Sequence, residues 1–358
     1  MQPNSKTHTA LPQSKEIRPP FVTVVMPIRN ETAHIGALIE QLFAQDYPAD
    51  RYEVIVADGM STDGTREILS RLMLKYSQLR MIDNPAKIVP TGLNAAIRAA
   101  RGSIIVRVDG HVALAPDFVR TSIELLQATP EAWAVGGPIV HAGESTFGNA
   151  AAVAMSSRFG VGNATHRFAD YEGFGEGTAF PAFHKWVFDR IGYFDEALVR
   201  NQDDEFNFRI AQAGGKFYIS PRIRYRYFVR DTLPRLARQY FQYSFWRIPV
   251  MRKHRRPTTL RQIIPLLFFL TMAAFAVLGV YMHIVVVATC LPLAYLFGLI
   301  GCGLAAVPQA GIRVAVLVPI AIATLHVSYA AGMLYGFLSA LFRPRAFAVD
   351  GSMTRLSR

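Results

Sequence analysis

The stretch VTVVMPIRNE at residues 22–31 sets the pattern of the whole amino-terminal part of the chain. An apolar run at residues 22–26 is closed by Pro27, a polar turn follows, and apolar residues then return every three or four positions. A short apolar run bounded by a turn is typical of a buried strand, and the later spacing is typical of a helix. The stretch therefore predicts a strand, a loop and a helix.

The same pattern occurs twice more along the chain. Residues 52–57 form an apolar run that ends at Asp58, and residues 103–108 form another that ends at Asp109. Repeated strand–helix units with continuous apolar strands predict a parallel sheet covered by helices on both faces. Because ligands bind beyond the carboxyl ends of such strands, we expect Asp58, Asp109 and the turn after the first strand to meet at one crevice.

Several common site types are excluded by the sequence. It has no GxGxxG after the first strand and no GxxxxGK[ST], which argues against a dinucleotide oxidoreductase and a P-loop enzyme. Its two cysteines, Cys290 and Cys302, both lie in an apolar region, so neither a disulfide framework nor a zinc site is expected.

Composition changes sharply near residue 262. From residue 263 to residue 341 only Arg313 carries a formal charge. Since about 20 apolar residues cross a bilayer, this region predicts three membrane spans, or four short ones. The candidate spans are residues 263–280, 283–300 and 314–341.

Basic residues flank these spans on both sides. By the positive-inside rule, MRKHRRPTTLRQ at residues 251–262 should be cytoplasmic. Further arginines follow the last span, and an odd number of spans would place them outside, so the pattern favours an even count or one re-entrant segment. These arginines are Arg343, Arg345, Arg355 and Arg358.

The net charge of +12 arises from one stretch. Residues 216–262 hold thirteen lysines and arginines against one acid, Asp231, and the rest of the chain is balanced. Such a stretch could bind nucleic acid, but it adjoins a membrane span, so membrane lipids or a lipid diphosphate are the favoured partners and no nucleic acid is expected. Arginines alternate with apolar residues from residue 233, as in a helix that lies in a membrane surface.

Together these features divide the chain into five parts. They are a disordered leader (1–20), an α/β domain (21–232), a basic amphipathic interfacial segment (233–262), transmembrane helices (263–342) and a basic tail (343–358).

Six motifs in the α/β domain carry a family resemblance. They are VTVVMPIRNE, VIVADGMSTDGT, TGLNAAIRAARG, IIVRVDGH, GYFDE and NQDDEFNFR. The order and spacing of these motifs resemble those of inverting family 2 glycosyltransferases over about residues 21–250. When the apolar tail is included, the chain is similar to the ExoA-like enzymes of succinoglycan and other exopolysaccharide assembly. The resemblance implies a GT-A nucleotide-sugar-binding (Rossmann-like) domain followed by a transmembrane region.

The resemblance places a metal and diphosphate site at Asp109-Gly110-His111, in the position of the family's DxD motif. Gly110 would let the backbone approach the phosphates, Asp109 would hold the ribose or a metal-bound water, and His111 would be the direct metal ligand. Histidine replaces the usual second aspartate, and a neutral imidazole accepts Mn²⁺ more readily than Mg²⁺. The cofactor is therefore expected to be Mn²⁺ or Mg²⁺. Taken alone, the tripeptide would be a plain turn.

The family's nucleotide pocket maps to the first two strand ends. Asp58 stands where the family binds uracil or ribose, although Gly59 replaces the second aspartate of many relatives. Pro27, Arg29 and Glu31 would line the same pocket. Glu31 could equally stabilise the start of the following helix.

The catalytic base is expected in the densest acidic cluster, NQDDE. Counting back from Arg209, which matches the arginine of the family's ED motif, places Asp203 at the base and Glu205 at its acidic companion. A carboxylate within hydrogen-bond reach can take the proton of an attacking hydroxyl. The alternative is a solvated helix start with acids on the positive end of the dipole, which Asp204 fits.

Two further segments resemble the acceptor side of the family. Gly175, Glu176 and Gly177 belong to a glycine-rich loop expected near the sugar. RQYFQYSFWR looks like a weakened (Q/R)xxRW motif in which Gln242 and Trp246 match. The tryptophan could stack on a sugar or lie at the level of the lipid headgroups.

The expected function is transfer of one sugar, glucose by preference, from a UDP-sugar with inversion to a lipid-linked (polyprenyl-diphosphate) saccharide in exopolysaccharide biosynthesis. The expected location is the bacterial inner membrane, multi-pass, with the catalytic domain cytoplasmic. Two alternatives remain open at this point: transfer to polyprenyl phosphate or a ceramide-like lipid, and a degenerate membrane scaffold that binds nucleotide sugars without turnover.

Overall fold

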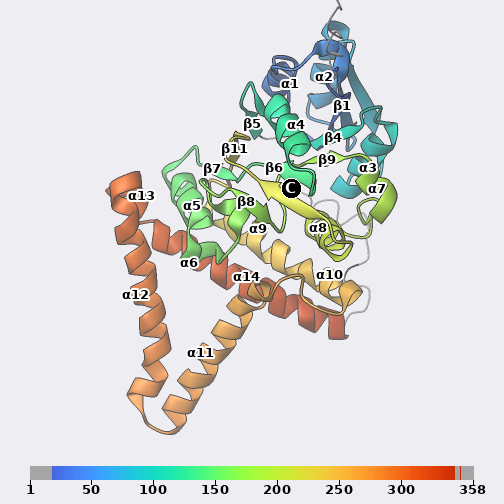
Figure 1. Cartoon of the computed structure of the whole chain (residues 1–358). Coiled ribbons are helices and arrows are strands. Elements are labelled where there is room, and N and C mark those ends of the chain that lie inside the picture. Colours follow the sequence, from blue (N-terminus) through green and yellow to red (C-terminus); the bar gives the residue numbers. More distant parts are fainter. Residues whose placement is uncertain (1–17, 111, 343–346, 348–358) are drawn as a thin grey trace, which may run out of the picture.

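The computed structural model describes residues 18–110, 112–342 and 347. Figure 1 shows an α/β body formed by the amino-terminal part of the chain, with long helices from the carboxyl-terminal part beneath it. Two of these helices extend away from the body, and a third runs across underneath it.

The body is built on an eight-stranded sheet with the order β3-β2-β1-β4-β9-β6-β10-β8. The three predicted strands are present as β1, β2 and β4, and these pair in parallel with one another and with β3. Strand β9 is antiparallel to both neighbours, β4 and β6. The bounds are β1 (Val22–Ile28), β2 (Tyr52–Asp58), β3 (Leu79–Asp83), β4 (Ile104–Arg107), β6 (Ala132–Gly136), β8 (Gly173–Gly175), β9 (Ala182–His184) and β10 (Lys216–Ile219).

The predicted strands thus form the parallel half of the sheet, and the other half is mixed. A parallel neighbour needs a long crossover that returns the chain to the same end of the sheet. Strands β8 and β9 both run opposite to β6 and β10, so the chain crosses this half of the sheet in both directions.

Helices cover both faces of the sheet, which explains why β1 and β2 are buried along their whole lengths. Val24 packs into one apolar core and its neighbour Val25 into the other, because successive side chains point to opposite faces. One core includes α1 (Ile35–Phe43), α2 (Thr65–Lys75) and α4 (Phe118–Ala128). The other includes α3 (Val89–Ala99), α7 (Trp186–Ile191) and α8 (Gln202–Gln212).

A small second sheet, with the order β5-β11-β7, lies beside the ends of the large one. Its strands are β5 (Val112–Leu114), β7 (Val140–Ala142) and β11 (Tyr225–Phe228). The segment after β7 forms α5 (Thr146–Ser156), α6 (Arg158–Val161) and the 3-10 helix η2 (Thr165–Arg167). These short elements lie between the sheet and the long helices (Figure 1).

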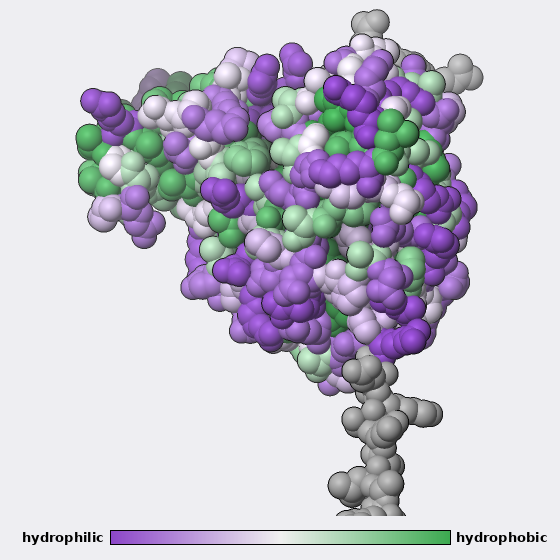
Figure 2. Space-filling view, turned by 90° about the horizontal axis from the view of Figure 1, so that it is seen from above, coloured by the Kyte–Doolittle hydropathy of each residue, from purple (hydrophilic) through white to green (hydrophobic). Residues whose placement is uncertain are grey.

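Three helical stretches are long and apolar enough to cross a membrane: residues 264–281, 285–310 and 312–342. The first two, α11 (Ile264–Tyr281) and α12 (Val285–Ala310), form the pair that extends away from the body in Figure 1. Val277 on α11 is 70% exposed and Phe297 on α12 is 68% exposed. Figure 2 views the molecule from above. It shows a mainly hydrophilic body and hydrophobic residues gathered on the projection at the left, where α13 (Ile312–Ala315) lies in Figure 1.

The third long helix, α14 (Val318–Phe342), packs along α9 (Leu233–Phe245) and α10 (Arg247–His254) rather than standing free. Two glycines allow this close approach. A Cβ at Gly332 would lie 2.2 Å from the carbonyl oxygen of Phe241, and one at Gly336 would lie 2.7 Å from Cγ1 of Ile248. The basic amphipathic helix α9 is thus held between the catalytic body and an apolar helix.

Candidate active site

The strand ends meet at one edge of the sheet, as the strand pattern predicts. The turn after β1 is tied to the loop after β2, because the Asn30 amide donates to Ser61 Oγ over 2.7 Å and the Thr62 amide donates to Asn30 Oδ1 over 2.8 Å. The Glu31 amide donates to Thr65 Oγ1. These contacts bring the first two strand ends together.

Asp58 is fully buried at the end of β2. It accepts hydrogen bonds from the Ser61 amide over 3.0 Å and from Arg66 Nη1 over 2.6 Å, and Arg66 also pairs with Asp83 at the end of β3. The carboxylate therefore holds the loop in place. A direct contact with a nucleoside would require one of these partners to be exchanged.

Two glycines bring the other nucleotide-side residues close together. A Cβ at Gly59 would lie 3.1 Å from Cβ of Arg29, so a second aspartate there would press on that side chain. A Cβ at Gly110 would lie 2.9 Å from Cγ of Glu31, which places the Glu31 side chain against the backbone that follows β4. Pro27 is buried within β1 at the base of this region.

Arg107 contacts both Asp109 and the candidate base, Asp203. Its Nη2 lies 3.1 Å from Asp109 Oδ1, and its Nη1 lies 3.6 Å from Asp203 Oδ2. Burial alone would lower the pKa of Arg107, but Asp109 and Asp203 outweigh burial and raise it. Arg107 was not among the expected residues, although a charged side chain inside an apolar strand, as in IIVRVD, needs a buried partner and is a usable signal.

The three acids at the start of α8 have different surroundings. The side chain of Asp203 is 48% exposed, that of Asp204 is 29% exposed and that of Glu205 is fully buried. Asp204 pairs with Arg247 and accepts from Thr258 Oγ1 over 3.0 Å. Of the three, Asp203 has the carboxylate most open to a substrate.

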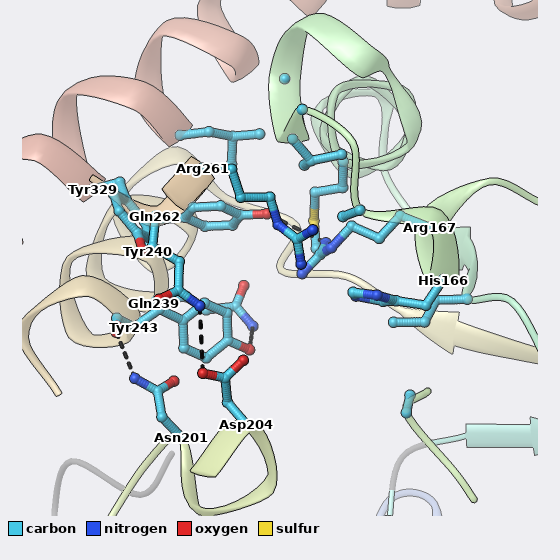
Figure 3. A pocket seen from close by; sticks show the side chains of 18 of the residues that line it. His166, Arg167, Asn201, Asp204, Gln239, Tyr240, Tyr243, Arg261, Gln262 and Tyr329 are labelled. Atoms are coloured by element: carbon cyan, nitrogen blue, oxygen red, sulfur yellow. Dashed lines mark hydrogen bonds between the residues drawn. The ribbon is translucent and has the colours of Figure 1, made fainter. Parts of the chain in front are cut away.

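A cavity of about 680 Å³ begins at Asp203 and Asp204 and continues to the apolar helices. Asp109, Asp203 and Arg107 line its catalytic end. Its other end is lined by Phe268 and Phe269 of α11, Tyr295 of α12, and Leu325 and Tyr329 of α14. Figure 3 shows its middle part, with His166 and Arg167 on one side and Gln239, Arg261 and Gln262 on the other.

Part of the glycine-rich loop lies beside this cavity. Glu176 and Gly177 line it, and Glu176 pairs with Arg261. Gly177 has φ +153°, and a Cβ there would lie 2.1 Å from Asn207 Nδ2, so this position requires glycine. Gly175 is the last residue of β8 and does not line the cavity.

Four other expected acceptor-side residues are not brought to the cavity. Glu205 pairs with Lys253 over 2.8 Å and with Arg209 over 3.0 Å, and Arg209 also donates to the carbonyl of Ile191. These contacts join α8 to α10 and to the end of α7. Gln242 is buried in α9.

The structure corrects the expectation for Trp246. Its side chain is fully buried, in a cluster with Ile88, Val199, Phe245 and Phe347. It therefore neither stacks on a sugar in the cavity nor lies at the level of lipid headgroups.

His111 lies outside the described residues, so the metal ligand expected there has no structural placement. Among the residues that the structure describes, no three histidine, cysteine, aspartate or glutamate side chains form a group that could hold a metal ion. Asp109 is 24% exposed and faces the cavity, and Glu31 lies against Gly110. Oxygen donors of this kind suit a divalent ion whose remaining ligands come from a diphosphate.

The chain is similar to known glycosyltransferases in sequence and in fold. The glycosyl transferase family 2 profile matches residues 23–190. Over 255 residues the chain is 33% identical to the succinoglycan biosynthesis protein ExoA of Rhizobium meliloti, covering 71% of this chain and 77% of that protein.

Two further proteins show a wider likeness. A dolichyl N-acetyl-glucosaminyl phosphate diacetamido-dideoxy-glucuronosyltransferase of Methanococcus voltae is 27% identical over 65% of this chain and 74% of that protein. The fold is also similar to the solved structure of the mannosyltransferase PcManGT of Pyrobaculum calidifontis in complex with GDP-Man and Mn²⁺. The superposition covers 94% of this chain and 85% of the mannosyltransferase, with a TM-score of 0.50 and 21% sequence identity, and this is a likeness of fold. The chain thus has a GT-A type α/β domain followed by apolar helices, belongs to glycosyltransferase family 2, and is a glycosyltransferase.

Proposed function

We propose that this enzyme transfers one sugar, with inversion, from a UDP-sugar to a saccharide linked to a membrane lipid through diphosphate. The observation that carries the proposal is the cavity that runs from Asp109 and Asp203 to the apolar helices α11, α12 and α14. A water-soluble acceptor would have no need of a path lined by Phe268 and Phe269. A lipid-linked acceptor would use its whole length.

Asp203 is the proposed general base. The acceptor hydroxyl gives its proton to an Asp203 carboxylate oxygen as the hydroxyl oxygen attacks the anomeric carbon, and the bond from that carbon to the diphosphate breaks as UDP leaves. One displacement of this kind inverts the anomeric centre. The Asp204 amide donates to Asp203 Oδ1 over 2.9 Å and Arg107 lies beside Oδ2, so both contacts orient the carboxylate.

The donor is proposed to bind at the strand ends, with Pro27, Arg29, Glu31 and Asp58 around the nucleoside and Asp109-Gly110 at the diphosphate. Asp109 and His111 would hold a divalent ion, Mn²⁺ or Mg²⁺, which when bound neutralises diphosphate charge as a Lewis acid. The Mn²⁺ and GDP-Man named for the mannosyltransferase of the same fold support a divalent ion here. Arg107 keeps Asp109 aligned toward the diphosphate.

Two buried amide groups support a sugar acceptor. Gln239 and Gln262 are 7% and 5% exposed, they line the cavity, and their Oε1 atoms have no hydrogen-bond partner among the described residues. A buried acceptor without a donor is costly. Sugar hydroxyl groups are donors of the required kind. The name of one sequence relative, which acts on a dolichyl-linked sugar phosphate, supports a sugar acceptor that is linked to a lipid.

The proposed location is the bacterial inner membrane, with α11 and α12 inserted and the catalytic body on the cytoplasmic side, where nucleotide sugars are made. The basic residues just before α11 support this orientation.

The test is transfer by the detergent-purified protein with UDP-glucose and Mn²⁺. We expect mass spectrometry to detect one added hexose on a polyprenyl-diphosphate-linked saccharide, with a β linkage from the α-linked donor. Polyprenyl phosphate and ceramide are offered in competition. Transfer to either of these, but not to the diphosphate-linked saccharide, would overturn the acceptor assignment.

A further inference from the structure

Arginine side chains are concentrated in the middle of the cavity. Arg247 and Arg261 pair there with Asp204 and Glu176. In contrast, three other lining arginines form no ion pair with a carboxylate among the described residues, and these are Arg158, Arg167 and Arg230. Like charges that are gathered in a partly enclosed space without counter-ions are costly unless an anion occupies it.

The contacts of these arginines leave their charge available. Arg167 Nη1 lies 3.4 Å from His141 Nε2 and 3.5 Å from Tyr240 Oη, which are both uncharged partners. Arg158 lies over the ring of Phe168 at 5.3 Å. The positive charge of Arg230 acts on its neighbour Arg200. Burial lowers the pKa of Arg200, and the charge of Arg230 lowers that pKa further.

A histidine beside them stays neutral. Burial lowers the pKa of His166 to about 3, and the charges of Arg167, Arg261 and Arg247 add to this effect. Figure 3 shows His166 next to Arg167 on one wall of the cavity. A neutral imidazole there can donate an N–H to an oxyanion without adding to the repulsion among the arginines.

The position of this group in the cavity indicates which anion it suits. Arg158 belongs to α6, which is held against the membrane helices because the imidazole Nε2 of His326 on α14 lies 3.2 Å from the Gly160 carbonyl oxygen. Arg167 contacts Tyr240 of α9, in the middle of the cavity. Asp109 and Asp203 are held elsewhere, by Arg107. Arg158 and Arg167 therefore lie between the carboxylates and the apolar end, and Arg230 lines the same cavity near Arg200.

We propose that Arg167 and Arg230, with Arg158 at the membrane side, bind the diphosphate that joins the acceptor sugar to its lipid, while the lipid chain leaves along Phe268, Phe269 and Leu325. The inference rests on the proposed function, since it assigns the charged part of that acceptor. The sugar then reaches Asp203, and its hydroxyl groups meet the Gln239 and Gln262 oxygens.

The test is binding without turnover, by titration calorimetry of the detergent-purified full chain. The probes are farnesyl diphosphate, inorganic diphosphate, farnesol and UDP. Arg167→Gln and Arg230→Gln should each raise the Kd for farnesyl diphosphate by about tenfold or more, the usual effect of losing a hydrogen bond between charged groups. The Kd for UDP should stay unchanged.

Matched controls are Arg235→Gln and Arg238→Gln on the exposed side of α9, which remove the same charge near the same membrane surface but outside the cavity. They should bind farnesyl diphosphate like the wild type. Farnesol and inorganic diphosphate should each bind more weakly than farnesyl diphosphate. The binding of inorganic diphosphate should depend on Arg167 and Arg230 in the same way as that of farnesyl diphosphate.

Unchanged farnesyl diphosphate binding in both cavity variants would overturn the inference, as would an equal loss of UDP binding, which would assign the arginines to the donor. The two proposals fail separately. Absence of sugar transfer to any lipid-linked saccharide would contradict the proposed function. The inference about the arginines is decided by the binding of farnesyl diphosphate, which is measured without donor.

Discussion

Arg107 and Asp203, which are 96 positions apart in the chain, lie side by side, with Nη1 of the arginine 3.6 Å from Oδ2 of the aspartate. The same guanidinium group contacts Asp109 over 3.1 Å. One side chain at the end of β4 thus positions both the carboxylate proposed at the diphosphate and the carboxylate proposed as the base. In the proposed mechanism, the alignment of donor and acceptor depends on this contact.

Replacing Arg107 should impair catalysis more than donor binding. We expect Arg107→Gln to lower kcat by about 100-fold, the scale of loss from misplacing a reacting group by an ångström. Arg107→Lys keeps the charge without the planar fork and should lose less. The measurement is steady-state UDP release, with the Kd for UDP determined alongside. Arg120→Gln removes an arginine paired with Asp46 and Glu124 on the surface and should be neutral. Full kcat in Arg107→Gln would contradict a positioning role.

Removing the Glu205 carboxylate should destabilise the protein. Its side chain is fully buried against Arg209 and Lys253. Lys253 keeps Asp195 as a partner, but Glu205→Gln removes the carboxylate that pairs with Arg209, which is 19% exposed, at a cost of about 1–3 kcal/mol. Thermal unfolding in detergent should show a clearly lower Tm. The control is Glu131→Gln, which removes the carboxylate of an exposed ion pair with Lys216 and should change Tm little. A Tm equal to that of the wild type would show that the Glu205 cluster does not hold α8 to α10.

Stability should also depend on pH through the same residue. Burial raises the pKa of Glu205, but hydrogen bonds and charge from Arg209 and Lys253 outweigh burial and hold it below the ordinary value of 4.5. The stabilisation is therefore fully present above about pH 4.5 and is lost as pH falls through the lower folded value. Tm measured from pH 7 down to pH 3 should fall more steeply in the wild type than in Glu205→Gln. Parallel curves would argue against this linkage.

The docking of α14 on α9 should be sensitive to a single methyl group. Because a Cβ at Gly332 would meet the Phe241 carbonyl oxygen at 2.2 Å, Gly332→Ala should force the helices apart and destabilise the protein by about 1–3 kcal/mol. Gly301→Ala on α12 makes the same chemical change where nothing lies within 4 Å. Its Tm should match that of the wild type. Equal Tm values for the two variants would indicate that α14 does not pack on α9 in this way.

Metal removal should abolish transfer reversibly. We expect EDTA to stop UDP release and Mn²⁺ to restore it better than Mg²⁺, since an imidazole ligand favours Mn²⁺. His111→Asp should shift the preference toward Mg²⁺, which prefers oxygen ligands. Activity of the EDTA-treated wild type without added metal would rule out the divalent ion, and an unchanged Mn²⁺ to Mg²⁺ ratio in His111→Asp would remove His111 from its coordination.

The parts of the fold that follow from local sequence were predictable. The strands that end at Asp58 and before Asp109 were predicted because a continuous apolar run and its polar end are local signals. The antiparallel β9 was not, because the residues around it do not show from which end the chain enters the sheet. Trp246 was expected on a sugar or at the lipid headgroups, because the sequence does not show that a partner such as Phe347, 101 positions away, covers it.

The site was predictable to a similar extent. The expected carboxylates Asp109 and Asp203 do line one cavity. The side chains between them and the membrane, such as Arg167 and Gln239, come from η2 and α9, and no spacing in the sequence relates these elements. Glu205 was expected as the acidic companion of the base from its place in the family's motif, but on a helix a spacing of two positions turns a side chain to another face.

The central claim is that Asp203 removes the proton from a lipid-linked acceptor. Its most direct test compares acceptor-dependent UDP release from UDP-glucose by the wild type and by Asp203→Asn, with the Kd for UDP measured on both. We predict a rate lower by about 10²-fold to 10⁴-fold in the variant, the usual contribution of a general base, with an unchanged Kd. A variant that releases UDP within twofold of the wild-type rate would contradict the account.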